Sequence, residues 1–548
     1  MRYEFSLSGG EGNYVAPDKE YSSLDPKDQI KYGFLVEENR NKEERLQLPE
    51  LNSGFDTVYW YRGRSITTIA ADEHGCFISS EKPETLPCTF VTDVLSKGNY
   101  QVTVTLFAER TIKEAMIFLG RRRLAFVGEI QAGSYWTRTF ITNICPIIPR
   151  NHSEEMEDTT LDVTILGDGL HLKSLEVEPI DCKTIYIAGD STVTDQSADY
   201  PYYPYHSYCG WGQMLSYYVG TQAAISNHSH SGLTTESFRS EGHYKILIDQ
   251  IKAGDICLFQ FAHNDQKLLH LKAEEGYKEN LYKYIGEIKE KGATPILVSP
   301  LARNTWKGND DSYNDLLIDY ARVCKELAAE CEIPLVELHK KSKELVMRMG
   351  KEQVKAYFFP SDYTHSNDYG AFLFAEFVYE DLVSAKIIAP NKEIAKNVFI
   401  PPKEMPEIVP PMELADIEDP NAERLFEHLE RPNDLLTRVE ALELVITAMH
   451  FFPTNVYNDA FDDVIGHEVY AGTVECAYQN GLIPDTMVED KKFYPTSQIS
   501  GTEFLAIVEN GYKSRKGKLK LNASMKSMKT ECVITRSAAA ELCRQLHI

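Results

Sequence analysis

From residue 184 to about residue 390, short apolar runs alternate with longer stretches that carry apolar residues at helical spacing. The apolar runs cover residues 185–188, 223–226, 256–261, 295–298 and 334–338, and the helical stretches include 213–219, 272–291 and 313–330. Strands that are apolar on both sides need cover on both sides, and their alternation with helices is typical of a parallel sheet between two helical layers. Residues 183–390 are therefore predicted to form an α/β domain of three layers.

Residues 1–182 carry a different pattern, in which short runs of β-forming residues are separated by turn residues. The run 100–106 alternates strictly between apolar and polar side chains after a Gly98-Asn99 turn signal, and further runs cover 115–119, 137–141, 161–166 and 175–177. Short strands at modest spacing, without a long helical pattern between them, predict a β-sandwich.

After the α/β domain, residues 391–425 hold six prolines interleaved with acidic residues, which predicts an extended acidic linker. Residues 426–548 are predicted to be helical and to contain a weak internal repeat. Each repeat starts with a Thr or Ser helix cap, followed three residues later by glutamate in the first two: Thr437/Glu440, Ser500/Glu503 and Thr535/Ala538. The repeat resembles a degenerate S-layer-homology module, and a small helical bundle without a surface role is the alternative.

Composition limits the partners that a chain of 548 residues can have. The formal net charge is -25 and the sequence pI is near 5.1. Nucleic acids and anionic membranes bind clustered Lys and Arg, so neither is expected as a partner. The excess of negative charge also disfavours a polyanionic substrate unless a local basic patch exists. No apolar run is long enough to span a bilayer.

The cysteines bear on the cellular compartment. There are 11 of them with no Cys-x-x-Cys, and several stand in apolar runs, as Cys257 does. Buried free thiols favour a reducing compartment, and residues 1–13 contain no apolar segment of signal-peptide length. These features favour a cytoplasmic protein. If a signal peptide had been removed, the S-layer-like tail would instead indicate a secreted or cell-surface protein.

A candidate nucleophile stands where the first apolar run of the α/β domain ends. The run leads into Gly189-Asp190-Ser191-Thr192, so Ser191 lies at the carboxyl end of a strand, where open α/β sheets bind ligands. The glycine allows a tight bend, and the next helix can direct its first N–H groups toward the serine. By themselves these residues would serve equally well as a helix cap.

Further candidate groups follow at other element ends. Asp362 and His365 are three residues apart, so the carboxylate can hold the imidazole Nδ1–H and leave Nε2 free to accept the serine proton. Gly232 follows the second apolar run and Asn264 closes the third, and their N–H groups can donate to a developing oxyanion. Because each element meets the same edge of the predicted sheet, chance is a poor explanation.

In chain order these residues match the sequence blocks of the SGNH (GDSL-type) hydrolases, named for Ser, Gly, Asn and His. Segments 209–213, 263–267 and 297–303 resemble the rhamnogalacturonan acetylesterase branch in particular, and the resemblance covers about residues 184–385. It implies a flavodoxin-like, three-layer parallel sheet. One departure is Ala262, where the family often has glycine.

The resemblance also implies roles. Ser191 would be the nucleophile, His365 its base, and Asp362 the group that orients His365. The oxyanion hole would consist of Ser191, Gly232 and Asn264, and no metal or other cofactor is needed.

Substrate contacts are predicted around the same edge of the sheet. An aromatic insert at residues 200–208 has flat faces that suit sugar rings, although a self-packed Tyr/Pro loop explains it equally well. The residues that we expect to bind substrate are Asp190, Trp211, His263 and Tyr205. His228 and His230 alternate on a strand end, and such residues usually line a surface, so no metal is expected there.

These features predict a carbohydrate O-acetylesterase that acts on plant cell-wall polysaccharide or oligosaccharide. A general short-chain acyl esterase or lipase is the first alternative. A non-catalytic glycan-binding or cell-surface adhesion protein is the second, and the intact Ser, Asp, His and Asn argue against it. The N-terminal domain resembles galactose-binding-like or carbohydrate-binding modules in pattern, so it either binds glycan or walls the active site. The chain is also compatible with a homodimer.

Overall fold

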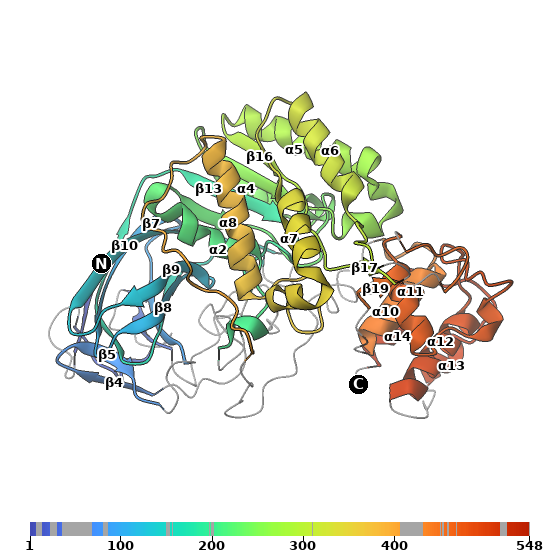
Figure 1. Cartoon of the computed structure of the whole chain (residues 1–548), viewed down its shortest axis with the longest axis horizontal. Helices are drawn as coiled ribbons and strands as arrows, with labels where there is room; N and C mark the ends of the chain where they lie inside the picture. The colour runs from blue at the N-terminus through green and yellow to red at the C-terminus, as the bar shows by residue number, and fades with distance from the viewer. Residues whose placement is uncertain are drawn as a thin grey trace.

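The computed structural model describes residues 1–6, 14–21, 30–35, 68–80, 86–148, 154–155, 157–196, 198, 202–308, 311–405, 431–449, 451, 454–457, 460–466, 468–515 and 523–546. Figure 1 shows three parts along the chain: β strands at the N-terminal end, a central α/β part, and a helical C-terminal part.

The central sheet is parallel throughout, as the alternating pattern predicts. Its strand order is β14-β13-β15-β16-β18, so the first strand in sequence lies between the second and the third. Its strands are β13 (Thr184–Gly189), β14 (Ala224–Asn227), β15 (Ile256–Gln260), β16 (Thr294–Val298) and β18 (Leu335–Val336). This order is that of flavodoxin-like folds, in which ligands bind at the carboxyl edge where the strand order reverses.

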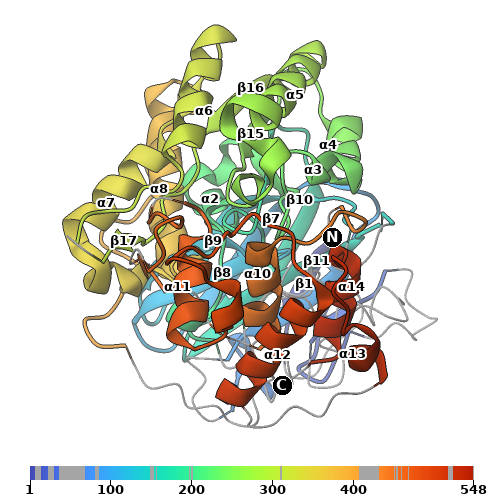
Figure 2. The same ribbon diagram turned by 90° about the vertical axis from the view of Figure 1, so that its right-hand side faces the viewer.

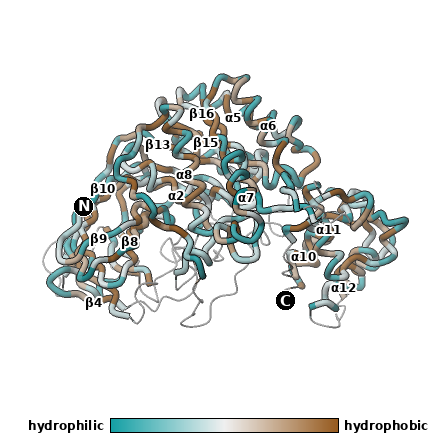
Figure 3. Tube along the Cα trace, viewed as in Figure 1, coloured by the Kyte–Doolittle hydropathy of each residue, from teal (hydrophilic) through white to brown (hydrophobic). Residues whose placement is uncertain are grey.

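Helices cover both faces of this sheet (Figures 1 and 2). One layer holds α2 (Trp211–Val219), α7 (Leu338–Gln353) and α8 (Asp368–Ser384), and the other holds α4 (His243–Gln250), α5 (Lys278–Glu290) and α6 (Ile318–Glu330). Side chains of β13 alternate between the two cores: Ile185 and Ile187 pack with the first layer, Tyr186 and Ala188 with the second. Figure 3 shows apolar residues concentrated along the central strands and α8.

The N-terminal strands form two sheets. In the first, the strand order is β10-β7-β12-β1-β2, and in addition β5 pairs with β12 and β4 pairs with β5. In the second, the strand order is β3-β6-β11-β8-β9. The strands are β1 (Arg2–Phe5), β2 (Tyr14–Val15), β3 (Tyr32–Phe34), β4 (Ile69–Asp72), β5 (Gly75–Ile78), β6 (Cys88–Asp93), β7 (Gly98–Ala108), β8 (Ile112–Leu119), β9 (Arg123–Ile130), β10 (Tyr135–Ile144), β11 (Thr160–Leu166) and β12 (Leu170–Pro179). Apolar residues of both sheets share one core. In β7 the alternation seen in the sequence buries Val102, Val104 and Leu106 completely.

Three of the C-terminal helices begin directly after the predicted caps. The Thr437/Glu440 and Ser500/Glu503 boxes are both formed, and the Thr535 hydroxyl accepts from the Ala538 N–H. The segments before the caps are joined in a ring, in which Leu436 N–H donates to Ile534, Ile534 to Ile499, and Ile499 to Leu436. The helices are α10 (Arg438–Ala448), α11 (Ala471–Gln479), α12 (Gly501–Arg515), α13 (Ala523–Ser527) and α14 (Arg536–Arg544).

A two-stranded parallel pairing joins the helical part to the central part. The strand β17 (Trp306–Lys307) pairs with β19 (Val456–Tyr457). Short helical turns complete the described elements: η3 (Pro204–His206), η4 (Gly220–Gln222), α3 (Ser237–Ser240), η5 (Asp265–Lys267), η6 (Leu269–Leu271), η7 (Ala273–Tyr277), η8 (Val354–Tyr357) and η9 (Asp485–Met487).

The first residues of the predicted linker pack on the central part instead of running free. Asn391 donates its side-chain amide to the Tyr218 carbonyl at 3.1 Å, and Phe399 is buried against the rings of Tyr369 and Phe372. Residues 406–425 of that prediction lie outside the described residues. All 11 cysteines are free thiols, and within the described ranges no helix is long and apolar enough to cross a bilayer.

Candidate active site

Ser191, His365 and Asp362 form a continuous hydrogen-bonded chain. Ser191 directly follows β13 at the point where the strand order reverses. Its Oγ lies 2.8 Å from His365 Nε2, and His365 Nδ1 lies 2.7 Å from Asp362 Oδ2. Because an ionised carboxylate can only accept, Nδ1 carries the hydrogen and Nε2 is left to accept the serine proton.

The local turn keeps Asp362 ionised. Its Oδ1 accepts the backbone N–H groups of Thr364 at 2.7 Å and His365 at 2.9 Å. Burial raises the pKa of this carboxyl, but His365 and the two N–H donors outweigh burial and hold the pKa below its usual value. Asn367 then caps α8 by accepting from Gly370 N–H at 3.0 Å, so His365 stands just before a fixed helix start.

The candidate oxyanion donors follow the neighbouring strands. Gly232 lies after β14 with φ of 77°, a left-handed conformation that glycine adopts freely. Asn264 lies after β15, is 9% exposed, and donates its side-chain amide to the Leu233 carbonyl at 3.1 Å, which ties the two loops together. One amide hydrogen of Asn264 remains for an oxyanion. Ser191, Gly232 and Asn264 therefore follow three adjacent strands at one edge.

Ala262, at the position where the family often has glycine, adopts a strained backbone conformation. Its φ is 121°, a region that side chains with a Cβ rarely adopt. Ala262 N–H donates to Asp265 Oδ2 at 3.1 Å, and Asp265 Oδ1 accepts the Thr235 hydroxyl at 2.6 Å. These bonds hold the loop that carries Asn264 in a shape better suited to glycine.

Three of the residues predicted to bind substrate are instead buried beneath the site. Asp190 and Trp211 are 0% exposed and His263 is 2% exposed. Trp211 Nε1 donates to Gln260 Oε1, Gln260 Nε2 to Thr192 Oγ1, and Thr192 Oγ1 to Asp190 Oδ1, each at 2.7 Å. His263 links Asp190, at 3.1 Å, to the Leu301 carbonyl, at 2.9 Å. This network positions the loops after β13 and β15.

Tyr205, the fourth predicted substrate residue, is also buried, as part of a largely self-packed insert. Its ring packs on Tyr203 and His206. Tyr208 stacks on Phe359, with ring centroids 3.7 Å apart, and meets the His365 ring edge-on at 5.7 Å. The structure therefore favours the packed-loop interpretation over a sugar platform for residues 202–208, while Tyr200 and Pro201 lie outside the described residues.

Comparison with known proteins identifies the family. The GDSL-like Lipase/Acylhydrolase family matches residues 187–371, which include the hydrogen-bonded chain and both oxyanion loops. The rhamnogalacturonan acetylesterase RhgT of Bacillus subtilis is 31% identical over 213 residues, which are 36% of this chain and 88% of RhgT. The chain belongs to this family.

A second relative extends the comparison. The uncharacterized esterase YxiM of Bacillus subtilis is 30% identical over 216 residues, which are 39% of this chain and 55% of YxiM, so the match spans about half of that protein. A crystal structure of YxiM has 22% identity and a TM-score of 0.37, covering 71% of this chain and 99% of that one. Membership makes this GDSL-family protein a serine ester hydrolase.

Arg122, which no sequence pattern indicated, reaches the esterase site from the turn between β8 and β9. It is fully buried, and its guanidinium donates to the carbonyls of Gln196 (2.8 Å) and Tyr208 (2.6 Å) and to Asp368 Oδ2 (2.5 Å). Gln196 in turn donates its side-chain amide to the Ser191 carbonyl at 3.0 Å. Asp368 starts α8, three residues after His365. One arginine therefore holds both the loop that carries Ser191 and the segment that follows His365.

The histidines considered as metal ligands lie in a cationic environment. Burial lowers the pKa of His228 to about 3, and the positive charges of Arg121 and Arg123 lower it further. The same two arginines oppose a metal cation at this position.

Elsewhere in the described residues, one group, His171 with Asp72 and Glu109, has ligand types suited to a metal. Each imidazole nitrogen of His171 faces a different carboxylate, at 3.2 and 3.3 Å.

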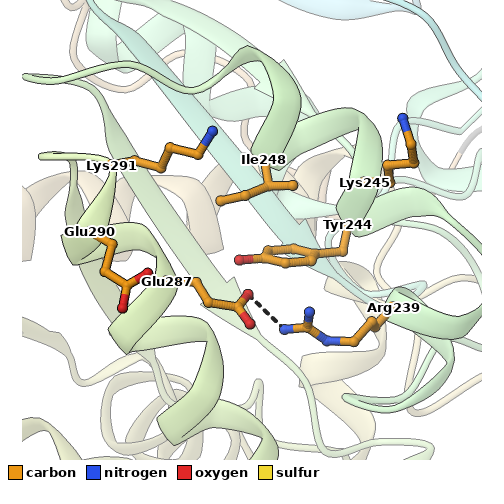
Figure 4. Close-up of a pocket in the computed structure, with 7 residues that line it drawn as sticks. All are labelled: Arg239, Tyr244, Lys245, Ile248, Glu287, Glu290 and Lys291. Carbon is orange, nitrogen blue, oxygen red and sulfur yellow. Dashed lines mark hydrogen bonds and ion pairs between the residues drawn. The ribbon is translucent and has the colours of Figure 1, made fainter.

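A surface pocket of about 610 Å³ between α3, α4 and α5 contains none of the catalytic candidates (Figure 4). Its lining residues are Arg239, Tyr244, Lys245, Ile248, Glu287, Glu290 and Lys291. Arg239 is paired with Glu287 at 2.8 Å and lies over the Tyr244 ring at 4.4 Å. The arginine that lines this pocket is therefore already paired within the protein.

Proposed function

We propose that this serine hydrolase is a carbohydrate O-acetylesterase that removes acetyl groups from plant cell-wall polysaccharide or oligosaccharide. The observation that carries the chemistry is the chain from Ser191 Oγ through His365 to Asp362, with hydrogen bonds of 2.8 and 2.7 Å. The substrate class is supported by the relative RhgT, whose name is rhamnogalacturonan acetylesterase.

In the first half-reaction, Ser191 Oγ attacks the acetyl carbonyl carbon while His365 Nε2 takes the hydroxyl proton. The carbonyl oxygen becomes an oxyanion that accepts hydrogen bonds from the backbone N–H groups of Ser191 and Gly232 and from the Asn264 side-chain amide. Asp362 stabilises the imidazolium ion. When the bond to the sugar oxygen breaks, His365 returns its proton to that oxygen, and an acetyl-serine remains.

In the second half-reaction, water is the nucleophile. His365 Nε2 accepts a proton from the water as its oxygen attacks the acetyl-serine carbonyl, and the same donors hold the second oxyanion. Collapse of this intermediate releases acetate, and the proton on His365 returns to Ser191 Oγ. The cycle consumes one water and restores the starting state of the three residues.

Acetate release from acetylated xylan, mannan and pectin tests the proposal. The wild type should release acetate from at least one of them, and Ser191→Ala should lose about a millionfold in kcat, the scale of nucleophile removal in serine hydrolases. Ser240→Ala, a change at the exposed end of α3, is the matched control and should keep full activity. Activity that survives Ser191→Ala would refute the mechanism. Butyryl esters cleaved as fast as acetyl esters would favour a general acyl esterase.

A further inference from the structure

His171 is a buried side chain whose two ring nitrogens are left without hydrogen bonds. It lies in β12 and is 0% exposed, and its ring centroid is 4.5 Å from that of Phe77 and 5.9 Å from that of Phe107. Within the described residues neither Nδ1 nor Nε2 makes a hydrogen bond. Buried polar groups in proteins almost always have a partner, because burial removes their hydrogen bonds to water. His171 therefore needs a partner that the hydrogen-bond pattern does not supply.

Two carboxylates face this imidazole from other strands. Asp72 ends β4, and its Oδ1 lies 3.2 Å from His171 Nδ1. Glu109 directly follows β7, and its Oε1 lies 3.3 Å from His171 Nε2. One imidazole nitrogen and one oxygen of each carboxylate can be chosen so that all three atoms lie within 4.8 Å of one another. Three possible metal ligands therefore converge from three different strands.

The two carboxylates have no basic side chain to balance them. Among the described residues their ion pairs are with His171 alone. Arg110, the neighbour of Glu109 in sequence, pairs instead with Asp168, and the Lys173 ammonium donates to the Glu73 carbonyl at 3.1 Å. One imidazole carries at most one positive charge, so at least one negative charge stays unbalanced. A divalent cation would balance it, in a chain whose net charge is -25.

The contact distances fit a zinc-like ion. Zinc binds imidazole nitrogen and carboxylate oxygen at about 2.0–2.2 Å, which places neighbouring ligand atoms of a tetrahedral site about 3.3 Å apart. The two contacts of His171 have this length. Only one nitrogen of an imidazole binds a given ion, and the other nitrogen of a zinc-bound histidine usually faces a carboxylate or carbonyl oxygen. With an oxygen at each of its nitrogens, His171 meets both requirements.

The group is open to solvent although His171 is buried. The side chains of Asp72 and Glu109 are 36% and 57% exposed, so an ion can reach the carboxylates directly and water can fill the fourth position. Calcium and magnesium ions take six or more ligands, nearly all of them oxygen, and fit one imidazole and two carboxylates less well.

We propose that His171, Asp72 and Glu109 bind one zinc-like divalent ion, which ties the β4–β5 hairpin to the N-terminal sheet. Backbone pairing holds this hairpin weakly: β5 pairs with β12 at one position, Cys76 with Leu172, and among the described strands β4 pairs with β5 alone. Figure 1 shows β4 and β5 at the end of the molecule away from the C-terminal helices. Asp72 belongs to the hairpin and the other two ligands to the sheet, so the ion cross-links them. The site is separate from the esterase chemistry.

Zinc titration of the metal-stripped full-length protein, followed by calorimetry, tests the site. The wild type should bind one zinc ion per chain in the micromolar range or tighter, and calcium at least about tenfold more weakly. Asp72→Asn and Glu109→Gln, both at exposed side chains, should each weaken zinc binding by at least about tenfold. Glu73→Gln is the matched control, because it changes an adjacent exposed carboxylate outside the group, and it should leave the affinity unchanged.

Amide hydrogen exchange gives a second measurement, made on the hairpin itself. Zinc should slow exchange in β4 and β5 in the wild type and in Glu73→Gln, but not in Glu109→Gln, because binding to the folded state alone suppresses local opening. The proposal would be overturned by zinc binding weaker than about 0.1 mM, by binding that survives both Asp72→Asn and Glu109→Gln, or by equal affinity for calcium. Hairpin exchange that zinc leaves unchanged would overturn the cross-link.

Discussion

Replacing Arg122 by methionine should destabilise the fold and the catalytic site together. Methionine keeps much of the volume but removes every donor, so Asp368 stays fully buried without its cation, and the carbonyls of Gln196 and Tyr208 lose their partner. Breaking a buried ion pair at one side costs about 3–5 kcal/mol, and each orphaned carbonyl adds about 1–3 kcal/mol before relaxation. Because neighbouring losses are not additive, we expect a total of about 4–6 kcal/mol.

The sign of the pH dependence gives this prediction a second test. Burial raises the pKa of Asp368 above its usual value, and Arg122 opposes that rise. In Arg122→Met the opposition is lost, so the folded pKa rises further above the unfolded one. A carboxyl with a raised folded pKa contributes stability below its unfolded pKa and loses it as the pH rises through the folded pKa. The difference in free energy of unfolding between the wild type and Arg122→Met should therefore grow as the pH rises.

Urea unfolding across a pH series, with kcat on an aryl acetate, checks both parts. Arg110→Met is the matched control, because Arg110 forms an exposed pair with Asp168 on the same N-terminal part and should cost at most about 1 kcal/mol. Adding Asp368→Asn to Arg122→Met removes the unpaired charge and should recover part of the loss at neutral pH. Two results would refute the proposal that Arg122 holds the Ser191 and His365 loops together. One is a loss of less than about 1 kcal/mol in the free energy of unfolding of Arg122→Met, and the other is no recovery of that free energy in the double variant.

Three further outcomes follow from the same structure. Asp362→Asn should lower kcat by about 10⁴-fold with little change in the urea midpoint, because the amide can no longer hold His365 in the required tautomer. Ala262→Gly should raise the free energy of unfolding by about 1 kcal/mol by removing strain at φ of 121°, whereas Ala253→Gly, in an exposed turn without positive φ, should lower it. His228, whose pKa burial lowers to about 3, should stay neutral in the folded protein, so the unfolded chain alone gains a proton below about pH 6.5. As the pH falls further, the free energy of unfolding should decrease by up to about 1.4 kcal/mol per pH unit because of His228. Unfolding curves of His228→Gln across a pH series should lack this contribution.

The catalytic candidates were accessible from the sequence because their signals are local. A strand pattern of six residues places Ser191 at the sheet edge, and the three-residue spacing of Asp362 and His365 matches one turn. The capping boxes at Thr437 and Ser500 were equally readable, since both partners lie within one helical turn. Within the Asp362–His365 pair and within each capping box, the partners are so close along the chain that their contact hardly depends on the rest of the fold. The contact between Ser191 and His365 spans 174 residues, and it was the family resemblance that connected them.

The contacts that were not predicted join distant parts of the chain. Arg122 and Asp368 are 246 residues apart, and no periodicity links a hairpin turn to a helix start across that distance. The error at Trp211 has a related origin: an aromatic residue after the nucleophile suggests a sugar platform, but its indole points inward to Gln260. The residue type indicates which interactions a side chain can make. Whether Trp211 faces solvent or the protein interior depends on how α2 packs.

The boundary predicted near residue 182 separates two folding patterns, but buried side chains cross it. The arginine cluster at the β8–β9 turn enters the α/β part, where Arg122 binds the loops of both Ser191 and His365. Arg123 donates at 2.7 Å to Asn143 in its own part and also to Ile225 in β14. Buried cations inside a neighbouring part of the chain are not expected for a module attached through a flexible linker. Each such cation costs free energy unless the groups that pair with it are always present. The N-terminal part therefore supplies a buried cation, Arg122, that holds in place the segments carrying Ser191 and His365.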